Sequence, residues 1–163
     1  MKRAVGIALL TLAALVQVTW APRFAVFGAF PNLVLIALVV TAWTAPPRAA
    51  MLWACAGGLL LDLASAGPVG PHALALLPGV YAIGVWTRNL QRPNTLHVAL
   101  TAAAATLLYS VVLVLAGNLL GTYVPPAGVV AELAIAAAVY NSLLTPFAFE
   151  VARRFRRRPQ PAS

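Results

Sequence analysis

The sequence predicts an all-α membrane protein with six transmembrane helices, from its composition, its apolar segments and the placement of its charges. Of its 163 residues, 62% are hydrophobic and 9% are charged, and the mean hydropathy is +0.90. A water-soluble domain is roughly 45–50% apolar and about 25% charged, so this composition requires lipid as the solvent. We expect one six-helix transmembrane domain over residues 1–152 and a basic cytoplasmic tail over residues 153–163.

Six apolar segments are separated by short breaks that contain proline, glycine or arginine. A membrane-spanning helix needs about 20 mainly apolar residues, with a range of roughly 17–25. The expected helices are Ala4–Trp20, Pro31–Ala45, Ala49–Ala64, Gly70–Thr87, Leu96–Leu120 and Ala127–Phe149. The second helix has an alternative start near Phe24. The first segment is long for a secretory signal and more apolar segments follow it, so we expect it to remain as a helix.

The basic residues predict the orientation of the chain. Six crossings with a cytoplasmic N-terminus place ten of the eleven basic residues inside the cell and leave only Arg23 outside. Short cytoplasmic loops of membrane proteins carry such an excess of lysine and arginine. Five crossings would send one of the two basic ends outside. We therefore expect a multi-pass protein of the bacterial inner membrane with both termini in the cytoplasm.

Five arginines follow the last apolar segment and form a basic cluster. Glu150 lies three and four residues before the first two of them, a spacing that predicts a local ion pair on one helix face. Each base near a membrane surface contributes roughly 1 kcal/mol of attraction to anionic lipid headgroups. No platform of aromatic side chains favours nucleic acid instead. The expected lipid or cytoplasmic contacts are Arg153, Arg154, Arg156, Arg157 and Arg158.

Asp62 is the most informative acidic residue, because a charge at membrane depth usually has a partner or a task. In one interpretation it caps the turn before the fourth helix, or it pairs with Arg23 at the interface. In the other, Asp62, His72 and Glu132 form a small polar recess on the outer side that receives a partner or a ligand. Among the three acidic residues, we expect replacement of Asp62 by alanine to be the most damaging.

No group of residues marks an enzyme. Ser65, His72 and Asp62 are close in the sequence, but nothing indicates a nucleophile elbow or an oxyanion hole. No set of histidine, cysteine and carboxylate side chains has metal-ligand spacing. We therefore predict no catalytic site, no cofactor and no metal. Three amides inside the apolar segments are expected to hydrogen-bond across helices: Gln17, Asn118 and Asn141.

Three segments of the chain resemble the rod shape-determining MreD family. Residues 17–22 end the first helix as in that family, and residues 28–35 open the second with a Pro-Asn-Leu start. The fullest likeness runs through residues 57–65 and 67–74, where Gly-Leu-Leu-Leu-Asp is followed by Gly-Pro-Val-Gly-Pro-His-Ala-Leu. The motif positions expected to be structural are Pro31, Asn32, Gly58 and Gly70.

The resemblance implies a non-enzymatic membrane scaffold of the cell-wall elongation (rod) complex, which supports rod shape and lateral peptidoglycan synthesis. It implies an MreC-like bitopic partner and, through it, MreB, RodA and a penicillin-binding transpeptidase. It also implies the six-helix fold of the S components of energy-coupling-factor transporters. Two alternatives remain: an S-component-like subunit that binds a small solute such as a vitamin, and a protein that flips or presents a wall precursor.

Overall fold

A computed structural model describes residues 2–19, 23, 28–65, 67–88 and 94–156, with only the backbone for residues 2–5 and 156. The predicted all-helical fold is confirmed for these residues. They form six helices: α1 (Lys2–Thr19), α2 (Leu33–Thr44), α3 (Pro47–Ala64), α4 (Pro71–Arg88), α5 (Thr95–Leu119) and α6 (Ala127–Arg156).

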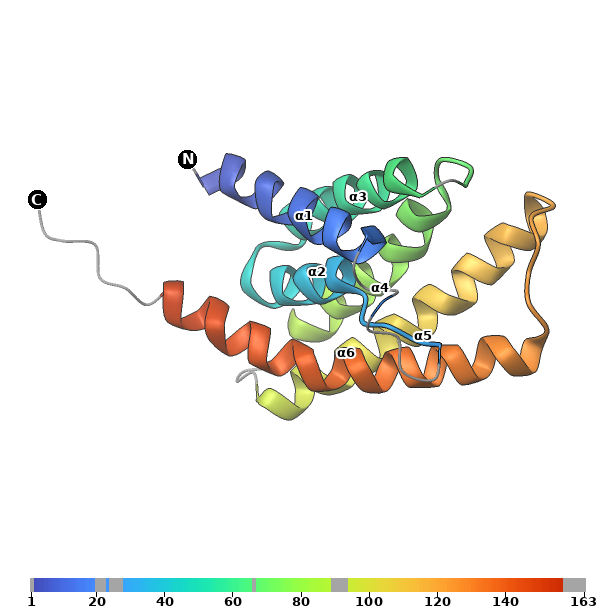
Figure 1. Ribbon diagram of the computed structural model, residues 1–163. Helices are drawn as coiled ribbons and strands as arrows, with labels where there is room; N and C mark the ends of the chain where they lie inside the picture. Colours follow the sequence, from blue (N-terminus) through green and yellow to red (C-terminus); the bar gives the residue numbers. More distant parts are fainter. Residues whose placement is uncertain (1, 20–22, 24–27, 66, 89–93, 157–163) are drawn as a thin grey trace, which may run out of the picture.

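Consecutive helices run in alternating directions (Figure 1). The beginning of α1, the turn between α2 and α3, and the end of α6 lie on one side, which we call the terminal end. The turn between α3 and α4 and the loop between α5 and α6 lie on the other side, the loop end. Because α5 and α6 have 25 and 30 residues, they extend beyond the four shorter helices at the loop end.

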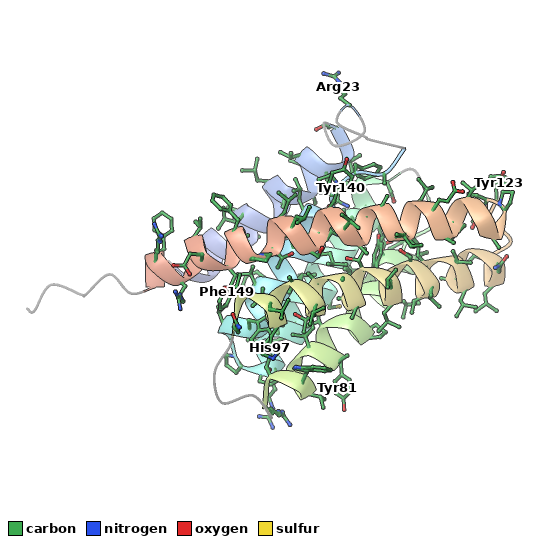
Figure 2. The ribbon with its side chains drawn as sticks, turned by 90° about the horizontal axis from the view of Figure 1, so that it is seen from below. Arg23, Tyr81, His97, Tyr123, Tyr140 and Phe149 are labelled. Atoms are coloured by element: carbon green, nitrogen blue, oxygen red, sulfur yellow. The ribbon has the colours of Figure 1, made fainter. Side chains whose placement is uncertain are left out.

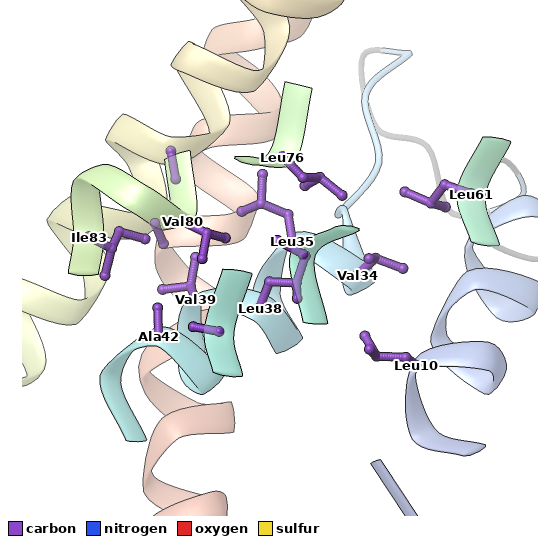
Figure 3. Close-up of a cluster of buried hydrophobic side chains, with 14 of the residues drawn as sticks. Leu10, Val34, Leu35, Leu38, Val39, Ala42, Leu61, Leu76, Val80 and Ile83 are labelled. Atoms are coloured by element: carbon purple, nitrogen blue, oxygen red, sulfur yellow. The ribbon is translucent and has the colours of Figure 1, made fainter. Parts of the chain in front are cut away.

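Helix α2 forms the centre of the protein and packs against all five other helices. Its Val34, Leu38 and Val39 side chains are at most 1% exposed. Around them lie buried side chains from α1, α3 and α4 (Figure 3). A helix that is hydrophobic all round is expected at such a central position. At 12 residues, α2 is about 18 Å long, which is short for a full membrane crossing.

Most helix starts differ from the predicted ones by one or two residues, and for α2 and α3 the structure shows a local reason. Helix α2 begins at Leu33 rather than at Pro31 or Phe24, because the Asn32 side chain accepts a hydrogen bond from the Leu35 N–H at 2.8 Å and caps the helix. Helix α3 begins at Pro47, two residues earlier than predicted. Proline suits the first helical position, where its missing N–H would have no partner anyway.

Helix α6 continues to Arg156, about two turns beyond the predicted end at Phe149. The Glu150 carboxylate binds Arg153 at 2.8 Å and Arg154 at 3.3 Å, so the predicted ion pair is confirmed. Ion pairs at these spacings stabilise a helix, and here they support the continuation of α6 into the basic cluster. The first residues of the cluster are therefore helical, whereas Arg157 and Arg158 lie outside the described residues.

Two of the described helices, α5 and α6, are long and apolar enough to cross a membrane. The apolar part of α1 and the whole of α2 are shorter. Large apolar side chains are exposed on the outer surfaces of the helices, such as Leu115 (56%), Ile135 (60%) and Phe147 (74%). A surface of this kind is compatible with contact to lipid.

Gly58 sets the distance between α3 and α4. A Cβ atom at this position would lie 2.2 Å from the Ala73 Cα and 2.6 Å from the Ala73 N, so the two backbones meet where α4 begins. Small residues allow such close approach of helices in membranes. The family-motif glycine therefore has a packing role.

We expect Gly58→Ala to lower the free energy of unfolding by roughly 1–3 kcal/mol or more, because the added methyl group forces α3 and α4 apart. Gly128→Ala is the matched control, since no atom lies within 4 Å of its added Cβ. Thermal unfolding in detergent measures both variants. Equal midpoints for the two variants would contradict the proposed close contact.

Candidate functional site

The beginning of α2 is buried, and side chains accept hydrogen bonds from three N–H groups there. The first N–H groups of a helix have no partner within the helix, and a lipid environment offers none. The Gln17 Oε1 atom of α1 accepts a hydrogen bond from the Val34 N–H at 3.1 Å. Asn32 caps Leu35, as described above. The prediction that Gln17 hydrogen-bonds across helices is thus confirmed.

Asn141 of α6 completes the cap and joins three helices. Its Oδ1 accepts a hydrogen bond from the Asn32 N–H at 2.9 Å, and its Nδ2 donates to the Thr106 Oγ1 of α5 at 2.9 Å. Asn141 is completely buried. The prediction for this amide is also confirmed, whereas the one for Asn118 is wrong, because that residue is exposed near the loop end.

Asp62 holds the beginning of α4 in the same way. Its carboxylate accepts hydrogen bonds from the His72 N–H at 2.9 Å and the Ala73 N–H at 3.3 Å, and the residue is 1% exposed. A carboxylate is well placed there, because a helix N-terminus carries partial positive charge. Of the two structural roles expected for Asp62, the structure shows the cap at the beginning of α4. It does not form the pair with Arg23, which is exposed and points away from the helices (Figure 2).

A histidine and a tyrosine connect these two caps. The His72 Nδ1 lies 2.6 Å from the Tyr109 hydroxyl of α5, and the two rings stack with centroids 6.1 Å apart. The Asn32 side chain lies close enough to the Tyr109 hydroxyl to interact with it. A continuous set of polar contacts therefore runs through all six helices. We call this set the polar core: Gln17, Asn32, Asp62, His72, Thr106, Tyr109 and Asn141.

His72 also lines a recess of about 350 Å³ at the loop end, between the α3–α4 turn and the α5–α6 loop. The other lining residues are mostly apolar or small, and Ser65, Thr122 and Tyr123 are among them. Glu132 is exposed on α6 and does not line this recess. The structure thus brings Asp62 and His72 together, and it leaves Glu132 and Arg23 apart from them.

The motif positions have separate structural roles. Gly70 has a φ of +122°, which favours glycine, and its carbonyl accepts a hydrogen bond from the Leu74 N–H at the start of α4. Pro31 precedes the Asn32 cap and is half-buried. Over the described residues, no group of three or more histidine, cysteine or acidic side chains could hold a metal ion.

Sequence reasoning did not single out Thr106 and Tyr109. The available signal was their spacing, since two polar side chains three residues apart in an apolar helix share one face. That face points into the polar core, where Thr106 is 2% exposed.

The two long apolar helices, the exposed apolar surface and the helix starts capped by side chains are compatible with a helical membrane protein. A family model described as rod shape-determining protein MreD matches residues 2–154. The chain belongs to the MreD family of bacterial membrane proteins, which determine rod shape. Comparison with curated proteins gives no match. Comparison with solved structures gives none either, so the expected likeness to S components stays a prediction.

We expect Asp62→Ala to lower the free energy of unfolding by roughly 1–3 kcal/mol, because two N–H groups at the buried start of α4 lose their acceptor. Asp62→Asn should restore only part of the stability, since its amide has one oxygen to accept the His72 N–H and turns an NH2 donor toward the Ala73 N–H. Glu132→Ala, at an exposed position, is the control. Unfolding in detergent and rescue of rod shape in cells measure the three variants. Wild-type stability and rescue by Asp62→Ala would contradict the capping role.

Proposed function

We propose that this protein is a non-enzymatic scaffold that holds the single membrane-spanning helix of an MreC-like bitopic partner within the rod complex. Membership of a shape-determining family supports the assignment to the rod complex. The observation that carries the proposal is an open apolar cleft between α5 and α6, about 570 Å³ in volume. Through this partner the protein would support MreB, RodA and a penicillin-binding transpeptidase during lateral peptidoglycan synthesis.

The cleft has the properties that a transmembrane helix needs. Helices α5 and α6 diverge toward the loop end (Figure 1), and the cleft opens between them. Its α6 wall carries Ala127, Ala131 and Ala134, which are spaced to share one face. Small side chains on one face let a second helix approach closely, and each good contact of this kind contributes roughly 1–2 kcal/mol in a membrane.

Exposed apolar side chains extend the contact area beside the cleft. Val111 and Leu115 of α5 are 55% and 56% exposed, and Ile135 of α6 is 60% exposed. Ser110 and Asn118 add polar groups to the lining, and these could hydrogen-bond a polar side chain of the docked helix. The partner would thus complete a three-helix contact in the outer half of the membrane.

All six helices lie in the bilayer in this proposal, with both termini in the cytoplasm. The alternating directions of the helices and the excess of basic residues at the terminal end support this orientation. The short helix α2 needs no lipid contact of its own, because its neighbours surround it. The basic cluster after Glu150 would then lie against anionic headgroups on the cytoplasmic surface.

The alternative, a vitamin-binding subunit, would place its ligand in the recess beside His72. Ligand pockets combine an apolar lining with a few convergent polar groups. The recess has such a lining, but Asp62 uses both carboxylate oxygens on α4 and Glu132 lies elsewhere. The α5–α6 cleft therefore supports the scaffold better than the recess supports a carrier.

We expect a photo-crosslinking amino acid at Val111 or Ile135 to capture a bitopic membrane protein in cells. The same amino acid at Leu63, 73% exposed on α3, is the control and should capture much less. Ala131→Trp should close the cleft and lower capture at Val111 about tenfold, the effect of losing roughly 1.4 kcal/mol of contact. Ala56→Trp, on the exposed surface of α3, should not change it.

Equal capture at all three positions would contradict a defined docking site. Purification of the protein with a stoichiometric small molecule and no protein partner would favour the carrier instead.

A further inference from the structure

Two arginines at the terminal end form no ion pair within the described part of the chain. Arg48 lies in the first turn of α3, Arg88 is the last residue of α4, and both are exposed. The chain has three acidic residues, and all are described. Asp62 caps α4, Glu150 binds the arginines of α6, and Glu132 is exposed near the beginning of α6. None of the three acidic side chains therefore pairs with Arg48 or Arg88 in the described structure.

A groove of about 50 Å³ lies beside Arg88, between α3 and α4. Its walls are mainly apolar and include Pro47 and Met51 of α3. A Cβ atom at Gly84 would lie 3.7 Å from the Pro47 Cβ, so the missing side chain keeps the groove open. The groove therefore combines one basic side chain, Arg88, with a mainly apolar lining.

A second groove of about 90 Å³ lies on the other side of α4, against α5. It is lined by apolar side chains and by small residues, among which are Ala82 and Ala104. Between the two grooves, α4 exposes Tyr81 (62%), Val85 (43%) and Trp86 (54%). Tyr81 points away from the helices (Figure 2). Tyrosine and tryptophan are enriched at the level of the lipid headgroups.

We propose that this surface of α3, α4 and α5 is a binding site for one anionic phospholipid. The phosphate group binds Arg88, Arg48 adds positive charge at the same end of the protein, and part of one acyl chain packs into each groove beside α4. Basic pockets between helices on the cytoplasmic side are suited to such headgroups. The inference rests on the proposed membrane orientation, and it is separate from the basic cluster at the end of α6.

Charge and shape together favour a lipid over an acidic protein segment. The two arginines provide positive charge at the terminal end, and the grooves beside α4 are mainly apolar. An acidic peptide would meet the arginines but would leave its polar backbone against the apolar grooves, which is unfavourable. A phospholipid satisfies both parts, because its charged headgroup continues into two hydrocarbon chains.

The test uses the purified full-length protein in nanodiscs of phosphatidylcholine with a fluorescent phosphatidylglycerol as the probe. We expect Arg88→Gln to weaken binding of the probe about fivefold, which corresponds to roughly 1 kcal/mol per surface arginine. Gly84→Leu keeps every charge and fills one groove, and it should weaken binding to a similar extent. Arg23→Gln removes the same charge at the opposite side and should leave binding unchanged.

Equal weakening by Arg88→Gln and Arg23→Gln would overturn the proposal, because it would indicate diffuse attraction by net charge. Equal binding of a fluorescent phosphatidylcholine would overturn it too, and so would retention of an acidic peptide in place of the lipid. Unfolding midpoints exclude misfolded variants, and Arg88→Gln carries the test if Gly84→Leu does not fold. The assay contains no protein partner. A negative result for lipid binding therefore does not contradict the proposed capture of a partner at the α5–α6 cleft.

Discussion

The buried beginning of α2 is the constraint on which the rest of the structure depends. A helix of 12 residues in the centre of an apolar protein must start where there is no water, so its N–H groups need acceptors from the protein. Gln17, Asn32 and Asn141 supply these acceptors from α1, from the chain before α2 and from α6. The cap of one short helix thereby holds the first and last helices in place.

The same requirement at the beginning of α4 explains the most unusual residue of the chain. The Asp62 carboxylate accepts hydrogen bonds from two N–H groups there. The contact of His72 with Tyr109 joins this cap of α4 to the cap of α2. The polar groups inside the protein are thus used for its own assembly. The surfaces left for partners lie elsewhere: the apolar cleft between α5 and α6, and the basic, aromatic surface around Arg88.

The helices could be predicted from the sequence because apolar runs and their proline and glycine breaks are local signals. The candidate site could be predicted only in part, because it depends on which helix faces meet. Threading six spans puts Glu132 at about the height of Asp62, but height does not determine the face of α6 on which it lies. The roles of Tyr109 and Asn141 depend on contacts between distant helices, which no local pattern in the chain specifies.

The central claim is that side chains of the polar core hold the buried helix starts, and Asn141→Leu tests it most directly. Leucine keeps the approximate size of the side chain and removes both of its hydrogen bonds. We predict that the free energy of unfolding in detergent falls by roughly 1–3 kcal/mol and that the Asn32 amide exchanges faster with deuterium. Asn118→Leu, at an exposed position, should change neither quantity. Unchanged stability and exchange in Asn141→Leu would contradict the account.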